Sequence, residues 1–362
     1  MTGSIPADHS TAGPASTEKT ATDNFASATA GKNETGKTSS PTMKDVAKEA
    51  GVSLGTVSKV VNGITVGKDY QKKVDDAIHK LNYRVNSYAQ GLKSSRTQTV
   101  AFLVPDTINP FFGTLTFHIN RALAKNGYRM LLCSTLASPE MEQSLLDMAE
   151  QNRVDGIICL SYNEKLQIKD STRLVTIDRH SGVFAPCVAS DNLAGGQLAV
   201  QKLAEFGCRH LLHMSISSVL PNEVTKRRDG FISACVSMGL EYQMLCLTDG
   251  SPFSMFYDYL AKHIAKGKPD FDGIFCGTDT LARMIIAKLN EWGIRVPEDV
   301  QVIGFNGIPD YATGQYQCST IVQPVEQIAQ TSVNLVLGAD LSKAPPLVCL
   351  PVSYAYGGTT LR

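Results

Sequence analysis

The chain has 362 residues, of which 43% are hydrophobic, so it is long enough for two or three domains with real cores. Its 34 basic and 34 acidic residues cancel, and no apolar run approaches the roughly 20 residues that span a bilayer. The N-terminus also lacks the charged-then-apolar order of a signal peptide. We therefore expect a cytoplasmic protein that makes no membrane contact.

The nine cysteines all lie beyond residue 130, are odd in number and form no CxxC pair. This usage is typical of reduced, mostly buried thiols. His210 and His213 are three apart on a predicted strand, so they point to opposite faces and cannot share a metal ion. We predict no metal, no cofactor and no catalytic residue.

The net charge of zero hides a difference between segments. Residues 1–42 carry 3 basic and 4 acidic groups, residues 43–96 carry 10 and 5, and residues 97–362 carry 21 and 25. The balances are therefore −1, +5 and −4. A small basic module on a mildly acidic body fits a chain that meets phosphates at one end.

Residues 1–41 are rich in Ser, Thr, Ala and Gly, and Phe25 is their only aromatic residue. Such a segment cannot bury enough apolar surface to offset its ordering entropy, so we expect a disordered tail. Folded-type sequence begins abruptly near Met43, which makes this methionine a candidate start of translation.

Residues 42–85 have the pattern of three short helices. Thr42 and Ser53 are suitable N-caps for the first two, Gly51 ends the first and Asn62 precedes the glycine that ends the second. The third helix is predicted over about 68–81. Its inner face and those of the other two are apolar, at Val46, Ala47, Ala50, Val57, Val60, Val61, Val74, Ile78 and Leu81. A tight glycine turn between the first two helices is typical of a helix-turn-helix.

From residue 99 onward, apolar strands alternate with amphipathic helices, which indicates parallel sheets in an α/β fold. The predicted strands are Val100–Val104, Arg129–Cys133, Gly156–Leu160, Leu174–Ile177, Leu211–Met214, Gly273–Cys276 and Val300–Gly304. The predicted helices cover about 112–126, 138–151, 193–206, 226–238, 254–266 and 280–292. This number of strand–helix units is more than a single sheet usually contains. We therefore predict two lobes with a ligand cleft between them.

The segment TMKDVAKEAGVSLGTVSKVVNG, Thr42–Gly63, closely resembles the headpiece of the LacI/GalR family of bacterial repressors. The resemblance continues through KKVDDAIHKLNYRVN, NSYAQGLKSSRT, VPDTINPFF, RRDGF, FDGIFCGTD and RVPEDVQVIGFN, and reaches the C-terminus. It implies a small all-α helix-turn-helix headpiece and a two-lobed α/β core like periplasmic binding proteins, with two Rossmann-like parallel sheets. The implied function is a sequence-specific DNA-binding transcriptional repressor, controlled by a small-molecule effector, a sugar above all, between the lobes.

In this family the residues just inside the second helix read bases in the major groove. The resemblance implies DNA contacts here from Thr42, Ser53, Leu54, Gly55, Thr56, Ser58, Lys59, Asn62, Tyr83, Asn86, Ala89, Leu92 and Lys93. Lys59 replaces the commoner arginine, which gives a point charge rather than a planar fork. Leu54 and Gly55 offer no hydrogen-bonding side chain, so base choice there would rest on thymine-methyl contact or on fit.

Residues 87–93 resemble the family's hinge helix, whose leucine wedges into the minor groove at the operator centre. That leucine is Leu92 here. Seven residues that include Gly91 are too short to hold a helix alone, because nucleation is unfavourable and glycine costs about 1 kcal/mol relative to alanine. We expect the hinge to order only on DNA.

For the effector cleft, the resemblance implies residues at strand ends and helix starts: Asp106, Phe111, Phe112, Asp178, Arg179, Arg227, Asp279 and Asn306. Carboxylates and guanidinium groups can hold vicinal hydroxyls, and a phenylalanine face can stack on a sugar ring. Arg227 and Asp279 are the strongest candidates. The chain departs from the family at Asn306, where GFD is usual, and at Cys208, where histidine is common.

We predict a tail (1–41), a headpiece (42–85), a hinge (86–97) and a core (98–362). One lobe would comprise about 98–190 and 322–345, and the other about 191–321 and 346–362. A homodimer on a palindromic operator is expected, because one headpiece buries little DNA surface. Tetrameric relatives add a C-terminal heptad helix, whereas residues 355–362 have no heptad repeat.

Parts of the sequence also match three other functions. The sequence GVSLG at residues 51–55 matches the elbow of serine hydrolases, but it follows a predicted helix rather than the strand which that motif needs. A pure binding protein is an alternative, since the core also resembles periplasmic sugar receptors, although the basic headpiece disfavours it. A regulator whose main partner is a phosphorylated carrier protein is another alternative.

Overall fold

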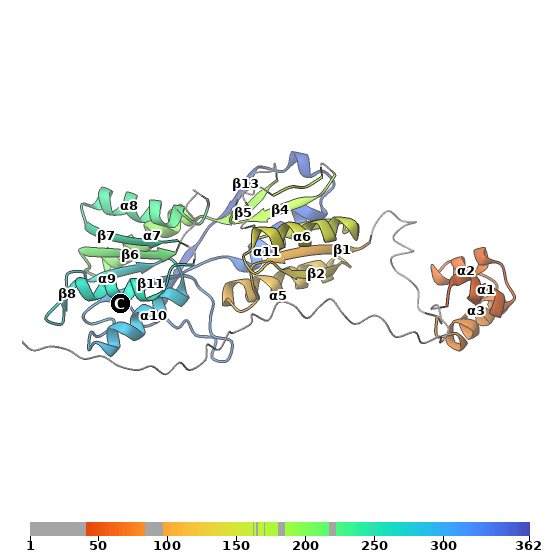
Figure 1. The fold of residues 1–362 in the computed structure, drawn as a ribbon, viewed down its shortest axis with the longest axis horizontal. Helices are drawn as coiled ribbons and strands as arrows, with labels where there is room; N and C mark the ends of the chain where they lie inside the picture. The colour runs from red at the N-terminus through yellow and green to blue at the C-terminus, as the bar shows by residue number, and fades with distance from the viewer. Residues whose placement is uncertain are drawn as a thin grey trace, which may run out of the picture. The chain divides into compact units, whose positions relative to one another are not determined.

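The computed structural model describes residues 41–83, 97–161, 163, 166–169, 171–179, 185–216, 222–248 and 250–362. The predictions of a disordered tail and of a hinge that orders on DNA lie outside these residues. The chain divides into two compact units, with the boundary between Val85 and Asn86. Figure 1 shows the headpiece helices in the first unit and the α/β core in the second.

The headpiece consists of helices α1 (Met43–Ala50), α2 (Leu54–Val61) and α3 (Lys68–Lys80). Thr42 caps α1 in the reciprocal arrangement with Asp45, and Gly51 ends it in the left-handed conformation at φ 64°. The predicted caps and helix ends are therefore confirmed. The helices share a small apolar core in which three valines are fully buried, namely Val46, Val57 and Val74.

The first lobe of the core is built on a parallel sheet with strand order β13-β5-β4-β3-β1-β2. Its strands are β1 (Thr99–Val104), β2 (Arg129–Ser134), β3 (Gly156–Cys159), β4 (Leu174–Ile177), β5 (Cys187–Ser190) and β13 (Leu347–Leu350). Helices α5 (Pro110–Lys125) and α11 (Val325–Leu337) pack on one face, and α6 (Pro139–Gln151) packs on the other. A 3₁₀ turn, Leu341–Lys343, follows α11.

The second lobe has a sheet of order β14-β12-β11-β10-β6-β7, parallel except for β14 against β12. Its strands are β6 (His210–Ile216), β7 (Glu241–Leu247), β10 (Gly273–Cys276), β11 (Gln301–Asn306), β12 (Ser319–Val322) and β14 (Ser353–Ala355). Helices α7 (Asn192–Glu205) and α8 (Lys226–Met238) cover one face, while α9 (Ser254–Lys262) and α10 (Asp279–Glu291) cover the other. A small hairpin joins β8 (Ile264–Ala265) to β9 (Lys268–Pro269).

The chain crosses between the lobes after β5, after β12 and after β13. The predicted crossings near 191 and 321 agree with the first two. The third prediction, near 346, is wrong, because Leu347–Leu350 form β13, which pairs in parallel with β5 in the first lobe. The crossing therefore falls between Leu350 and Ser353. The predicted architecture of two lobes with parallel sheets is confirmed.

Close helix packing fixes the second lobe near the cleft. A Cβ on Gly196 of α7 would collide with the backbone carbonyl of Arg227, and one on Gly230 of α8 would collide with that of Leu193. Only glycine allows two helix backbones to approach so closely. This contact sets the position of α8, which carries Arg227 at its N-terminal end.

Within the part of the chain that the structure describes, no helix is both long enough and apolar enough to cross a membrane.

Candidate DNA-binding and effector-binding sites

The second headpiece helix, α2, presents one face to solvent and buries the other. Val57 and Val60 lie in the headpiece core, whereas Leu54, Gly55 and Lys59 are exposed. Leu54 keeps 46% of its surface accessible, which is unusual for a leucine in a folded module. An exposed helix face that combines an apolar tip with a cation suits entry into the major groove of DNA.

The small polar side chains of α2 are held by local hydrogen bonds. The Oγ of Ser53 accepts the backbone N–H of Thr56 at 3.1 Å, and the two hydroxyl oxygens lie 2.9 Å apart. The Nδ2 of Asn62 donates to the carbonyl of Ser58 at 2.7 Å. These bonds stiffen both ends of α2, so the exposed face keeps a defined geometry.

The other predicted DNA contacts divide into three groups. Thr42 is exposed and caps α1. Tyr83 is 9% exposed and packs in the headpiece core, so little of its side chain is available for the predicted contact. Burial also raises the pKa of its hydroxyl. The remaining predictions concern residues outside the described ranges, namely Asn86, Ala89, Leu92 and Lys93.

A cleft of about 740 Å³ opens between the two lobes and is lined by residues of both. This size is in the usual range for small-molecule sites. Most of the predicted effector residues line it: Asp106, Phe111, Phe112, Asp178, Arg179, Arg227 and Asn306. Asp279 lines a neighbouring pocket, called the side pocket here, which shares Asn306 and several other residues with the cleft.

Asp178 follows β4 and has a left-handed backbone, with φ at 59°. It is 4% exposed, and among the described residues its Oδ1 has no hydrogen-bond partner. Burial raises the pKa of this carboxyl group, an effect that the nearby Arg227 and Arg179 oppose. A buried acceptor of this kind is costly unless something donates to it, and a ligand hydroxyl in the cleft would do so.

Arg227 is 5% exposed and its guanidinium is engaged by the protein itself. Its Nε donates to Oδ1 of Asn192 at 2.7 Å, and its Nη1 donates to the carbonyl of Gly277 at 2.8 Å. The guanidinium also lies over the ring of Phe305, 3.7 Å from the centroid. Arg227 therefore supports the cleft wall as well as lining it.

The phenylalanines of the cleft are positioned by the turn before α5. Oδ1 of Asp106 accepts the N–H groups of Ile108 and Asn109 at 2.8 and 2.7 Å. The Oδ1 of Asn109 then accepts the N–H of Phe111 at 3.0 Å and caps α5. Phe111 and Phe112 meet edge to face, with ring centroids 5.8 Å apart. Asp106 thus shapes the aromatic wall against which a ligand ring can lie.

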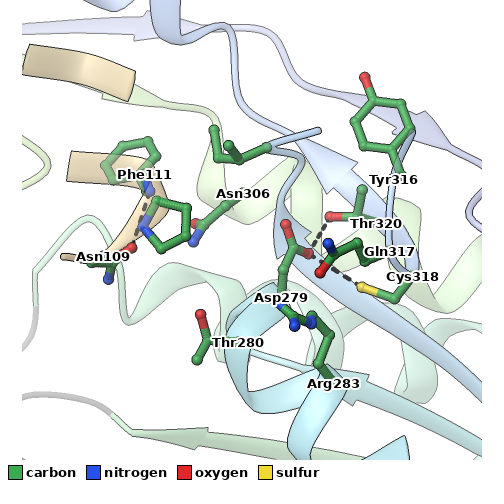
Figure 2. Close-up of a pocket in the computed structure, with 12 residues that line it drawn as sticks. Asn109, Phe111, Asp279, Thr280, Arg283, Asn306, Tyr316, Gln317, Cys318 and Thr320 are labelled. Atoms are coloured by element: carbon green, nitrogen blue, oxygen red, sulfur yellow. Dashed lines mark hydrogen bonds between the residues drawn. The ribbon is translucent and has the colours of Figure 1, made fainter. Parts of the chain in front are cut away.

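The carboxylate of Asp279 holds together the far side of the side pocket (Figure 2). Its Oδ1 accepts the hydroxyl of Thr320 at 2.5 Å, and its Oδ2 accepts the N–H of Gly307 at 2.8 Å. Burial raises its pKa, while the Thr320 hydrogen bond lowers it. These bonds hold the loop after β11, and the ligand contact that the sequence predicts for Asp279 stays a prediction.

A polar network that sequence reasoning missed joins the two lobes. Ser190, at the end of β5, donates its hydroxyl to Oε1 of Gln323 at 2.8 Å. Gln323 donates its Nε2 to Oδ1 of Asn306, at the end of β11, also at 2.8 Å. All three side chains are buried. The sequence signal for this network is Gln323, next to Pro324 at a predicted lobe crossing. A buried amide needs hydrogen-bond partners, so a glutamine at such a crossing predicts polar contacts there.

Two family models together match most of the chain. The model described as "Bacterial regulatory proteins, lacI family" matches residues 42–86. The model described as "Periplasmic binding proteins and sugar binding domain of LacI family" matches residues 97–343. The chain belongs to the LacI family of bacterial regulatory proteins. It is a DNA-binding transcriptional regulator with an effector-binding core, as the resemblance implied.

Several curated relatives of this LacI-family chain are repressors. The ribose operon repressor of Halalkalibacterium halodurans is 32% identical over 303 residues, covering 82% of this chain and 89% of that protein. The sucrose operon repressor of Pediococcus pentosaceus is 30% identical, covering 82% of this chain and 91% of that protein. The transcriptional repressor PurR of Aliivibrio fischeri is 31% identical, covering 82% and 90%.

Solved structures of the family share the fold. A LacI-type regulator from Alkaliphilus metalliredigens, complexed with D-xylulofuranose, has a TM-score of 0.63 at 26% identity, covering 73% of this chain and all of that one. The Lac repressor dimer bound to operator and an anti-inducer has a TM-score of 0.74 at 22% identity, covering 90% and 100%. At 22% identity, the likeness to the Lac repressor shows a shared fold.

Proposed function

We propose that this LacI-family regulator is a cytoplasmic homodimeric repressor, without catalytic activity, whose operator affinity changes when a carbohydrate-type effector binds in the interlobe cleft. The observation that carries the proposal is the cleft itself, which both lobes line. It contains Oδ1 of Asp178, which has no hydrogen-bond partner among the described residues. Relatives named for ribose and sucrose operons, and a relative complexed with D-xylulofuranose, support a sugar-like ligand.

The proposed DNA contacts are the exposed positions of α2 and the hinge. Leu54, Gly55 and Lys59 would face base edges, with Ser53, Thr56 and Ser58 at the rim of the same helix face. Leu92 would enter the minor groove at the operator centre, flanked by Asn86, Ala89 and Lys93. Thr42 and Asn62 would lie near the phosphate backbone. Tyr83 has a packing role in this proposal, because it is buried.

In the effector site, Asp178 would accept ligand hydroxyls, with Arg179 and Arg227 donating to ligand oxygens. Phe111 and Phe112 would contact the ligand ring. Binding across the cleft favours the lobe arrangement that the ligand fits best, so effector shifts the population between two arrangements of the core. The Ser190–Gln323–Asn306 network joins a lobe crossing to the cleft, so its hydrogen bonds would change when the lobes rearrange.

An exposed apolar face supports a homodimer. Four side chains on β7 and the end of α8 keep large accessible fractions in the single chain, namely Val236 (66%), Met238 (45%), Tyr242 (37%) and Met244 (38%). β7 is also an edge strand of its sheet. Exposed apolar side chains gathered at a sheet edge are typical of a protein interface, and a second copy would cover them.

The test begins by selecting a duplex from a random pool with the full-length protein. Binding of the selected operator is then measured by fluorescence anisotropy, with and without a panel of sugars. We expect Lys59→Ala and Leu92→Ala to lose specific binding, and at least one sugar to change the affinity of the wild type. Lys72→Ala, an exposed cation on α3, is the matched control. Selection of no preferred sequence, or light scattering that shows a monomer on palindromic DNA, would refute the proposal.

A further inference from the structure

The side pocket contains a cation and an amide nitrogen that have no acceptor in the described part of the chain. Arg283 lies on α10 and is exposed, and Figure 2 shows its side chain reaching into the side pocket. Within the described residues it makes no hydrogen bond and no ion pair. Arg227, which lines the cleft, differs, because its guanidinium donates to Asn192 and to the carbonyl of Gly277. Arg283 therefore offers its donors to something that enters from the cleft.

Asn306 points a second donor into the same space. It is 7% exposed, and its Oδ1 is occupied by Gln323, so its Nδ2 group has no acceptor among the described residues. Figure 2 shows the amide directed toward Asn109 and Phe111, across the opening of the side pocket. The family pattern has an aspartate at this position, which would present acceptors. The change to asparagine replaces a negative charge with N–H donors.

The side pocket has the size of a single small group. Its volume is about 40 Å³, far below that of the cleft into which it opens. Pro110, Phe111, Thr280 and Asn306 line both spaces. A ligand body in the cleft could therefore place one substituent, and no more, into the side pocket.

The free hydrogen-bonding groups of the side pocket are mainly donors. Its lining contains one arginine, Arg283, and one carboxylate, Asp279. Both oxygens of Asp279 already accept hydrogen bonds, from the hydroxyl of Thr320 and from the N–H of Gly307. Arg283 keeps its N–H donors and its permanent positive charge available, so a group that offers acceptor oxygens and a negative charge complements it.

We propose that the effector is a hydroxylated compound with an anionic group, a phosphate ester or a carboxylate, and that Arg283 and Asn306 bind this group in the side pocket. Hydroxyls of the same compound meet Asp178 in the cleft. This inference rests on the proposed function and specifies its ligand. Charge-assisted hydrogen bonds from a guanidinium and an amide would give the anionic compound a large advantage over its neutral parent.

The experiment compares matched ligands on the full-length protein. D-Glucose, D-glucose 6-phosphate and D-gluconate form one set, D-ribose and D-ribose 5-phosphate a second, and inorganic phosphate is tested alone. Binding is measured by thermal shift and calorimetry. We expect an anionic member to bind at least tenfold more tightly than its neutral parent, and Arg283→Gln to reduce its affinity about 10- to 100-fold.

Two further variants sharpen the test. Lys288→Gln removes one positive charge from the same helix, where Lys288 pairs with Glu291 outside the side pocket, and should leave the anion preference intact. Asn306→Asp places a second carboxylate in the lining of the side pocket and should abolish the preference. The relative affinity of the phosphate ester and the carboxylate distinguishes the two sources of the anion.

The proposal is overturned if neutral parents bind as tightly as their anionic derivatives, if no anionic compound binds, or if the preference survives Arg283→Gln. Binding of inorganic phosphate as tight as that of any sugar derivative would also overturn it, because the anion would then not belong to the effector. The proposed function is tested separately by operator binding without ligand, so each can fail while the other stands.

Discussion

Replacing Arg227 with alanine is expected to destabilise the second lobe strongly, even without effector. The substitution removes two hydrogen bonds from a charged donor, to Asn192 and to the carbonyl of Gly277. Each such bond contributes about 1.5–3 kcal/mol, and the desolvated contact with the Phe305 ring adds up to about 2 kcal/mol. Because these contributions overlap, we expect a total loss of about 4 kcal/mol.

The neighbouring residue provides a matched control. Arg228 is on the same helix, is 38% exposed at its side chain and pairs with Asp229 at 2.9 Å. A surface ion pair contributes about 0–1 kcal/mol, so Arg228→Ala should be nearly neutral. The same loss of charge at adjacent positions should therefore give very different stabilities.

The assay uses the sole tryptophan of the chain, Trp292, which packs at the C-terminal end of α10 and reports on the second lobe. With a urea slope of about 2–3 kcal/mol per M, a loss of about 4 kcal/mol lowers the midpoint by about 1.3–2 M. A midpoint for Arg227→Ala equal to that for Arg228→Ala would show that the guanidinium does not support the cleft wall as described.

Three further predictions follow from local geometry. Ser53→Ala removes the acceptor of the Thr56 N–H, so the headpiece should lose about 1 kcal/mol, and amide exchange in α2 at the wild-type rate would contradict this. Asp178→Asn keeps a residue that tolerates positive φ but removes the charge; effector affinity measured by calorimetry should fall about tenfold, and an unchanged value counts against the site. Burial lowers the pKa of His213 to about 4, below the ~6.5 of an unfolded histidine. As the pH falls from about 6.5 to about 4, the unfolded state therefore binds a proton that the folded state does not, and stability decreases. The urea midpoint detected by tryptophan fluorescence should fall over this pH range, and His213→Gln should reduce that fall. A wild-type midpoint that does not change with pH would refute the prediction.

Local features of this chain were predictable because their partners are close in sequence. Thr42 and Ser53 cap helices through contacts three residues away. Val57 and Val60 are buried at helical spacing. The strands of the two lobe interiors, such as Gly273–Cys276, are short and fully buried, so their apolar runs were also visible.

Features that depend on distant partners were not predictable. β7 is an edge strand whose alternate residues are exposed, so its sequence lacks a buried run. β13 was assigned to the wrong lobe, because an apolar segment does not reveal which sheet it will join. Asp279 bonds to residues 28 and 41 positions away, so its support of the pocket wall could not be predicted from the sequence. The Ser190–Gln323 bond spans 133 positions.

The three crossings between the lobes have a consequence for how regulators of this kind can diversify. Neither lobe is one continuous stretch of chain, so no single recombination event can exchange a lobe for that of a relative. The headpiece helices, in contrast, run without interruption from Met43 to Lys80. One cut near the boundary at Val85 would transfer the whole reading module. One exchange at this boundary can therefore join a headpiece to another core, whereas a change confined to one wall of the cleft needs point substitutions such as the one at Asn306.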